Sequence, residues 1–299
     1  MNLFEDGMPF FKGNLHCHTT VSDGTLSPAE AVRLYRGLGY DLLALTDHRH
    51  LSGPSHLENG MLLLSGIEMD YTLPCEALHI VGIGMREEYA YRKNQWPDPQ
   101  SCIDGMRKYG GCAILAHPAW SLNTLATLTG LRHVTAAEIY NSFSTVPWNG
   151  DRADSSLLLD LAATHGTPYN VVASDDSHEY DGEAGQSFTM VQAEALTAEA
   201  VMQALRGGRF YASQGPGFEQ ITLEKDRVSI RCSPVETIIF YSNVPWVFGR
   251  CIAGSGQTAA EYSLRSSPEE ETFLRCQIID HNGKSAWSNP ILLPSFNHP

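Results

Sequence analysis

Short apolar segments alternate with amphipathic segments along most of this 299-residue chain, and this alternation is its strongest constraint on the fold. Apolar runs with the length and composition of β-strands recur between residue 11 and about residue 212. Strands that alternate with helices typically form βαβ units around a mostly parallel sheet. The number of units favours a barrel over an open sheet. The runs lie at 13–18, 42–46, 61–68, 77–84, 112–117, 136–141, 168–173 and 187–192.

Capping signals mark the helices between these runs. Ser27, Pro28 and Glu30 provide an N-cap, a proline at the first helical position and an acidic residue three positions after the cap. Gly39 suits the position after a helix end, so this helix is predicted to stop at Leu38. Three further helices are predicted in the same way, at 99–109, 155–165 and 197–205.

The pattern changes after Gly215-Pro216-Gly217. The segments that follow are short strands separated by turn residues such as Asn282-Gly283, without a convincing helical pattern. We therefore predict two domains, an α/β barrel over residues 1–214 and a small all-β sandwich over residues 215–299. With 42% hydrophobic residues, the chain can form one large and one small core.

Composition argues against several functions. The net charge of −14 lacks the basic surface that long nucleic acid requires, although bound cations would still allow a small phosphorylated substrate. No apolar run approaches the roughly 20 residues of a membrane span, and Met1 to Gly13 lack a signal-peptide pattern. The seven scattered cysteines form no CxxC pair, which indicates reduced thiols in a cytoplasmic protein.

Side chains that bind metals recur at the ends of the apolar runs. His16 and His18 point to one face, because side chains alternate along a strand, and Asp23 follows across a glycine-containing turn. The C-terminal strand ends of a parallel barrel open on one face, so such residues converge there. The other candidates, each at or next to an end of a later run, are His48, Glu68, His79, His117, Asp176 and His178.

These candidates are too many for one ion and suit two or three divalent transition ions. Cys17 alternates to the opposite strand face, so we interpret it as a packing residue. The spacing of Asp176 and His178 makes them face together, which leaves Asp175 as a supporting residue or a cap. The other histidines are interpreted as surface or packing residues.

At these positions the chain resembles the polymerase and histidinol phosphatase (PHP) family of metal-dependent phosphoesterases. The resemblance covers about residues 11–212 in the family's order, and the C-terminal segment resembles the accessory β domain of two-domain members. The matching motifs are Asn14-Leu15-His16-Cys17-His18-Thr19, Ser22-Asp23-Gly24, Leu45-Thr46-Asp47-His48, Gly66-Ile67-Glu68, Leu78-His79-Ile80, His117-Pro118 and Ser174-Asp175-Asp176-Ser177-His178.

The resemblance implies a distorted seven-stranded, TIM-like barrel with a trinuclear site of manganese, iron or zinc. It implies hydrolysis of a small phosphomonoester by metal-activated water. By motif, one ion would take His16, His18, Glu68 and Asp176, a second would share Glu68 and add His79 and His117, and a third would take Asp23, His48 and His178.

Several residues remain open between a functional and a structural role. Asp47 either orients a ligand or relays a proton, or it is a simple cap. Glu138 and Asn141 are candidates to support the ligands. Arg49 and Arg152 are candidates for a cation that binds the phosphate of the substrate, and the alternative for each is a solvated arginine.

Two other functions fit the same residues. The cluster would also suit phosphodiester or nucleotide hydrolysis, including exonuclease-type action. The chain could instead be an inactive, metal-stabilised scaffold whose C-terminal domain binds a partner. The loop residues Trp96, Phe143 and Trp148 either stack on a substrate ring or close the rim of the barrel. The sequence leaves the metal, the substrate and the oligomeric state undetermined.

Overall fold

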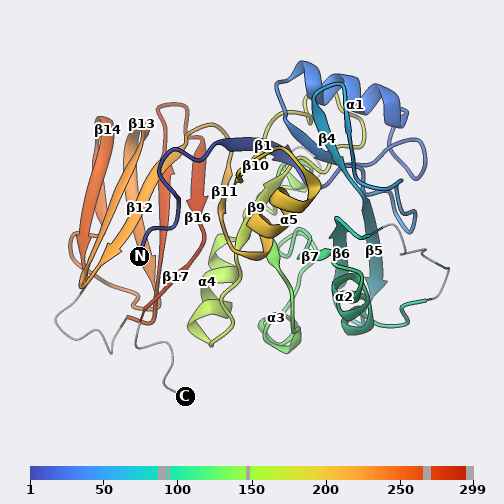
Figure 1. Ribbon diagram of the computed structural model, residues 1–299. Helices are drawn as coiled ribbons and strands as arrows, with labels where there is room; N and C mark the ends of the chain where they lie inside the picture. Colours follow the sequence, from blue (N-terminus) through green and yellow to red (C-terminus); the bar gives the residue numbers. More distant parts are fainter. Residues whose placement is uncertain (87–91, 93–94, 146–148, 265–270, 294–299) are drawn as a thin grey trace.

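The strands of the protein form two sheets, one of 12 strands and one of five, in a mixed α/β arrangement (Figure 1). This computed structural model describes residues 1–86, 92, 95–145, 149–264 and 271–293. The larger sheet contains β1 (Phe10–Asn14), β2 (Leu42–Ala44), β3 (His56–Glu58), β4 (Met61–Leu64), β10 (Phe188–Gln192), β11 (Phe210–Ser213), β12 (Phe218–Glu224), β13 (Arg227–Ser242), β14 (Cys251–Ser263), β15 (Phe273–Ile279), β16 (Ser285–Ser288) and β17 (Ile291–Leu292). The smaller sheet contains β5 (Gly66–Thr72), β6 (Ala77–Ile83), β7 (Cys112–Leu115), β8 (Ala136–Asn141) and β9 (Val171–Ser174).

The helices predicted from the capping signals are present. Their bounds are α1 (Pro28–Gly37), α2 (Pro99–Lys108), α4 (Ser156–Thr164) and α5 (Ala198–Arg206). In α1 the Glu30 carboxylate accepts the Ser27 backbone N–H at 2.9 Å, as the capping box requires. Two short elements were not predicted, the six-residue α3 (Leu125–Gly130) and the 3₁₀ turn η1 (Ser142–Ser144). No helix of the described residues has the length and hydropathy to span a membrane.

The predicted strand at 61–68 is two strands in different sheets. β4 ends at Leu64 and β5 begins at Gly66, so the chain crosses between the sheets at Ser65. A Cβ atom on Gly66 would lie 2.4 Å from the Leu45 carbonyl oxygen, which explains why glycine occupies the crossing point. Glu68 is thereby carried into the smaller sheet.

The strand directions correct the expectation of a mostly parallel sheet. β6 runs antiparallel to both of its neighbours, β5 and β7, whereas β7, β8 and β9 run parallel. Because β6 is reversed, its first residues lie beside the last residues of β7. His79 therefore pairs with Asp70, and its carbonyl accepts the Ala116 N–H at 3.1 Å, next to His117.

Single bridges connect the two sheets at the end that holds the candidate ligands. Cys17 bridges Ser177, which joins the segment after β1 to the segment after β9. His48 bridges Glu68, which joins the segment after β2 to β5. Below this end, an apolar core of both sheets and α5 is fully buried, and each large side chain there contributes about 1.5–3 kcal/mol. The seven-stranded barrel itself stays a prediction.

The C-terminal strands continue the larger sheet. β16 pairs with β11 in antiparallel register, and residues 1–4 run alongside β12, where the Leu3 N–H bonds the Ile221 carbonyl at 3.0 Å. Figure 1 shows the N-terminus beside β12 and β13. As predicted, strands without helices make up the described residues beyond Gly217. The boundary at 214/215 and the sandwich stay predictions.

A buried ion pair also ties the C-terminal strands to a helix of the preceding region. The Arg275 guanidinium on β15 donates to both carboxylate oxygens of Asp160 on α4, at 2.8 and 2.7 Å. Burial disfavours the charged guanidinium, but Asp160 raises the pKa of Arg275 above its ordinary value. The charge is therefore kept in the interior by its partner.

Candidate metal centre

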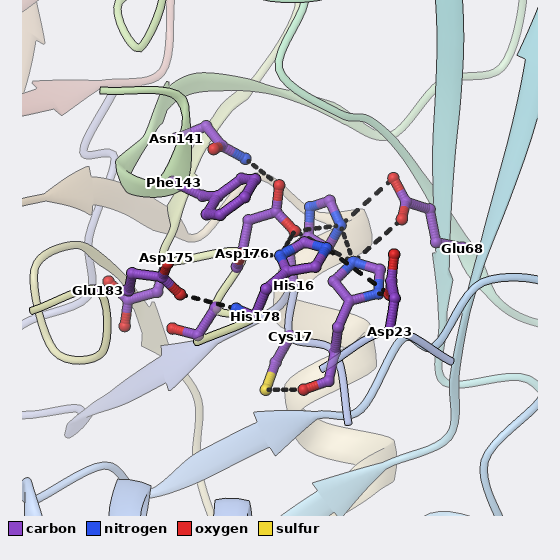
Figure 2. Close-up of polar contacts among 12 residues, drawn as sticks. His16, Cys17, Asp23, Glu68, Asn141, Phe143, Asp175, Asp176, His178 and Glu183 are labelled. Atoms are coloured by element: carbon purple, nitrogen blue, oxygen red, sulfur yellow. Dashed lines mark hydrogen bonds and ion pairs between the residues drawn. The ribbon is translucent and has the colours of Figure 1, made fainter. Parts of the chain in front are cut away.

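The nine candidate metal ligands converge at one end of the strands. Figure 2 shows His16, Asp23, Glu68, Asp176 and His178 among them. The segments after β1, β2, β7 and β9 supply most of them, while Glu68 belongs to β5 and His79 to the reversed β6. Figure 2 shows Cys17 pointing away from the cluster, in agreement with its interpretation as a packing residue. All seven cysteines are free thiols.

The centre of the cluster is formed by two histidines and two carboxylates, all buried. The Nε2 atoms of His16 and His18 lie 3.2 Å apart. Each Nε2 atom lies 3.1 Å from Asp176 Oδ1, and His18 Nε2 lies 3.1 Å from Glu68 Oε2. This arrangement of imidazole nitrogens and carboxylate oxygens is suited to a divalent ion.

A second group lies on the other side of Glu68. The Oε1 atom of Glu68 is 3.3 Å from His16 Nε2, 3.6 Å from His117 Nε2 and 2.8 Å from His79 Nδ1. Glu68 thus presents one oxygen to this group and the other to the centre. A carboxylate in this position can bridge two ions.

The third group faces the outside of the cluster. Asp23 is 53% exposed, and its oxygens lie 3.6 Å from His48 Nε2 and 3.7 Å from His178 Nε2. His18 Nδ1 lies 3.4 Å from the same carboxylate, so His18 contacts both this group and the centre. The resemblance assigned His18 to a single ion, whereas the geometry brings it close to two groups.

Unpaired buried atoms show that these residues fit bound ions. Glu68 Oε2, Asp176 Oδ1 and His48 Nδ1 are buried, and none has a hydrogen-bond partner in the described structure. An unsatisfied buried polar atom costs about 1–3 kcal/mol, more when it is charged. Coordination of cations would satisfy all three atoms, and the six histidines and three carboxylates form a donor set typical of manganese, iron or zinc.

The electrostatics keep the carboxylates ionised. Burial alone would raise the pKa of Glu68, but His16 and hydrogen bonds from neighbouring histidines lower it well below its usual range. The pKa of Asp176 is also lowered, because His16 and His18 outweigh its burial. Burial would depress the pKa of His18, but Asp176 and Glu68 raise it to about 9. The carboxylates are therefore ionised, and a bound cation would replace the protons that the neighbouring histidines hold.

Glu138 and Asn141 support the ligands, as expected from the sequence. Glu138 Oε1 lies 2.9 Å from His16 Nδ1, and Oε2 accepts the His117 backbone N–H at 2.8 Å. Asn141 Nδ2 donates to Glu138 Oε2 at 2.7 Å and to Asp176 Oδ2 at 3.1 Å. These contacts fix the ring of His16 with Nε2 toward the centre of the cluster.

Asp47 contacts the turn before Asp23 rather than the cluster itself. Its Oδ1 atom accepts the backbone N–H groups of Thr19 and Ser22 at 2.7 and 3.1 Å. The Ser22 hydroxyl also donates to Oδ1, and the Thr19 hydroxyl donates to Oδ2. The carboxylate therefore holds the turn that carries Asp23. This geometry favours the orienting role over the proton relay.

Asp175 and Asp176 point in opposite directions, as strand alternation predicts. Asp175 accepts the N–H groups of Gly185, Gln186 and Ser187 at 2.7–2.9 Å and lies against two buried tyrosines. Burial raises its pKa to about 6. Asp176 has a φ of +55° and His117 a φ of +30°, both positive values that residues other than glycine adopt uncommonly, although Asp and His do so more often than most. Sequence alternation does not reveal these backbone conformations.

The two candidate arginines differ in position. Arg49 lies at the rim, where Nε and an Nη atom bind the two oxygens of Asp70 at 2.8 and 2.7 Å. Its charge is thus already paired. Arg152 is exposed and does not line the cluster cavity. Neither is placed to contact a phosphate without rearrangement.

Aromatic residues narrow the cavity that lies over the cluster. The volume of this cavity is about 270 Å³. Phe143 stacks on His178 with ring centroids 4.3 Å apart. Trp120, which sequence reasoning missed, contacts His117 edge-on at 4.9 Å, and its position three residues after His117 is the only sequence signal for it. Trp96 packs in the core beside α2, and Trp148 lies outside the described residues.

Comparisons with known proteins agree with this geometry at the level of the fold. No family model matches the chain. The structure is similar over 96% of its length to a two-domain protein from Bacteroides vulgatus containing a predicted PHP-like metal-dependent phosphoesterase, with a TM-score of 0.54, 15% identity and 97% of that chain covered. The chain thus shares the fold of that two-domain protein, in agreement with the resemblance at the level of the fold.

Two curated proteins match a stretch of 77 residues, 24% of this chain. The stretch is 39% identical to a 5′-3′ exoribonuclease of Haemophilus influenzae and covers 28% of it. It is 34% identical to a 3′,5′-nucleoside bisphosphate phosphatase of Chromobacterium violaceum and covers 27% of it. The match thus spans little more than a quarter of each relative.

Proposed function

We propose that the chain is a hydrolase of phosphoric ester bonds that cleaves a small phosphomonoester at a cluster of two to three divalent ions. The observation that supports this most is the convergence of six imidazoles and three carboxylates around three buried, unpaired ligand atoms. Manganese, iron and zinc all suit these donors. The expected ligand assignment, with Glu68 shared between two ions, is part of the proposal.

The side chains have separable tasks in this proposal. Ions held at the cluster would supply a nucleophile from water at neutral pH and offset charge on the phosphoryl oxygens. Glu138 orients His16, and Asp47 orients the turn that carries Asp23. Trp120 and Phe143 restrict water at the mouth, while the exposed side at Asp23 leaves room for the ester to enter.

The finer architecture belongs to the same proposal. We infer that β1, β2 and β5–β9 act as a distorted seven-stranded barrel, supported by the bridges Cys17–Ser177 and His48–Glu68. Residues 1–214 would form the catalytic unit and residues 215–299 the accessory β unit. A cytoplasmic location would suit the seven free thiols.

Turnover of p-nitrophenyl phosphate by purified protein tests the proposal. We expect hydrolysis that depends on added Mn²⁺, Fe²⁺ or Zn²⁺ and is lost with chelator. His16→Ala and Glu68→Ala should each reduce it by about a hundredfold or more, because His16 is a donor at the centre of the cluster and Glu68 is the donor shared between two ions. His165→Ala, at an exposed helix end, is the matched control and should be unaffected. No metal-dependent turnover on monoesters or diesters would favour the inactive scaffold.

Phosphodiester or nucleotide hydrolysis is the second candidate. The observation that favours it is the 77-residue match to a protein named a 5′-3′ exoribonuclease. The net charge of −14 disfavours long RNA but permits an oligonucleotide of a few units. Comparing p-nitrophenyl phosphate with bis-p-nitrophenyl phosphate and short oligoribonucleotides separates the two candidates, since a monoesterase should act only on the terminal phosphate.

A further inference from the structure

A second hollow, which we call the side pocket, lies next to the cluster cavity. Its volume is about 370 Å³, and Phe143 lines both spaces. The loop after β9 forms one wall through Glu183 and Gln186. What we call the C-terminal wall is lined by Gln214, which follows β11 at the end of the predicted barrel, and by Lys284 in the C-terminal region. The side pocket therefore joins the two predicted domains beside the proposed reaction centre.

The loop wall is fixed by the residues that flank the candidate ligands. Glu183 Oε2 accepts three backbone N–H groups, including that of His178 at 2.8 Å. Asp175 binds the N–H groups of Gly185, Gln186 and Ser187. Two carboxylates thus hold the loop: Glu183, which binds the His178 N–H, and Asp175, which directly precedes Asp176. A group bound in the side pocket would meet a wall that is already ordered.

The C-terminal wall is also held in place. The Gln214 N–H donates to the Ser285 carbonyl at 2.8 Å, and Gln214 Oε1 accepts the Ser285 N–H at 3.2 Å. The Lys284 N–H donates to Asp280 Oδ1 at 2.9 Å, in the turn between β15 and β16. These bonds place the Lys284 side chain at the wall of the pocket.

Lys284 offers a charge partner to an anionic group on the occupant, beside two carboxylates, Asp181 and Glu183, that also line the pocket. Lys284 is the one cation among the described lining residues, and no described carboxylate forms an ion pair with it. Glu183 already accepts three N–H donors, and Asp181 is exposed at the edge. The amides of Gln186 and Gln214 offer further donors and acceptors. A polar group with a negative charge matches this lining.

We propose that the side pocket receives the leaving-group side of the phosphoester and that Lys284 ion-pairs with a second anionic group on it. This inference rests on the proposed phosphoesterase function and adds a substrate class, that of polar phosphoesters with a second carboxylate or phosphate. Lys284 and Gln214 are then specificity-determining residues. The C-terminal strands contribute to the choice of substrate rather than forming an appendage.

Paired substrates test the role of Lys284. 6-Phosphogluconate carries a carboxylate that glucose 6-phosphate lacks, and a nucleoside 3′,5′-bisphosphate carries a second phosphate that the 5′-monophosphate lacks. In Lys284→Ala we expect kcat/KM to fall about tenfold for at least one doubly anionic member, equivalent to about 1.4 kcal/mol. Its singly anionic partner and p-nitrophenyl phosphate should change less than about twofold. The pair that responds identifies the second anion.

Two further variants sharpen the test. Lys284→Arg should restore most of the preference, because it restores the charge, and Lys108→Ala, at the exposed end of α2, should have no effect. An equal loss on all substrates, or an unchanged preference in Lys284→Ala, would overturn the inference.

Binding separates this inference from the proposed function. If the unaltered protein hydrolysed no phosphoester, the proposed function would be wrong, but the binding role of Lys284 could still be tested. Calorimetric titration with the same substrate pairs would then decide the role of Lys284. Tighter binding of a doubly anionic member, lost in Lys284→Ala, would support the inference, and equal binding would overturn it.

Discussion

At the scale of single residues, Glu138 shows how the cluster is organised. It is buried and contacts two candidate ligands and Asn141 through its two oxygens. The sequence placed it near the correct face but did not reveal which atoms it contacts. Its role follows from the geometry, because an imidazole must be held with one nitrogen protonated toward a partner while the other faces the ion.

Glu138→Gln should weaken metal binding by about 10–100-fold. The carboxylate uses both oxygens to contact His16, His117 and Asn141, whereas an amide has only one oxygen that can accept hydrogen bonds. Competition with a coloured chelator measures the affinity directly. Glu194→Gln changes an exposed carboxylate and serves as the control. An unchanged affinity in Glu138→Gln would show that the ring of His16 needs no such partner.

The identities of the candidate ligands could be anticipated, but their conformations could not. Strand alternation correctly separated Asp176 from Asp175 and turned Cys17 away from the cluster. It could not anticipate the left-handed φ of Asp176 and His117, which depends on contacts from distant strands. The same limit explains why Trp120 was missed, since only its position three residues after His117 indicates its proximity to the cluster.

At the scale of elements, strand direction decides which residues reach the cluster. His79 lies at the start of its strand and reaches the cavity only because β6 runs opposite to its neighbours. Apolar periodicity marks a strand but carries no information on its direction. This explains why the helices and most strands could be predicted while the parallel arrangement could not. The crossing from β4 to β5 was hidden for the same reason.

Gly66→Ala should destabilise the fold by roughly 1–3 kcal/mol, because the new Cβ would lie 2.4 Å from a backbone oxygen that cannot rotate away. Urea-induced unfolding under matched metal conditions measures the change. Gly53→Ala meets no atom within 4 Å and should be neutral or slightly stabilising. Equal stabilities of the two variants would contradict the close approach at the crossing.

Asp160→Asn should cost about 3–5 kcal/mol of unfolding free energy, because it leaves the buried Arg275 guanidinium without its counter-charge. The exposed pair of Arg227 and Glu261 offers a matched control. Glu261→Gln should cost less than about 1 kcal/mol. Similar small effects in both variants would show that Arg275 finds solvent or another partner.

At the scale of the whole molecule, the cluster concentrates charge inside an already acidic chain. Six histidines and three carboxylates meet in one region of a protein whose net charge is −14. The mixed α/β architecture and the likeness to a two-domain fold could be anticipated from the sequence, because alternation and motif order extend over long stretches. The continuity of the larger sheet into the C-terminal region did not, because pairing between distant strands leaves no local pattern.

Elemental analysis of protein purified without chelator should find at least two transition ions per chain, because the three ligand groups, which share His16 and His18, together hold more donors than one ion binds. Removal of the ions should also lower the midpoint of thermal unfolding, since bound ions stabilise only the folded state. A stoichiometry of one or less, or unfolding that is indifferent to chelator, would contradict a cluster of several ions.

The pairing of β11 with β16 has a consequence for how such a chain can evolve. A gene shortened after residue 214 would encode a sheet whose edge strand had lost its neighbour, and exposed edges of this kind invite aggregation. The first residues of the chain would lose their own partners on β12 at the same time. Recombination could therefore not discard the C-terminal segment cleanly, and the two regions would be inherited together.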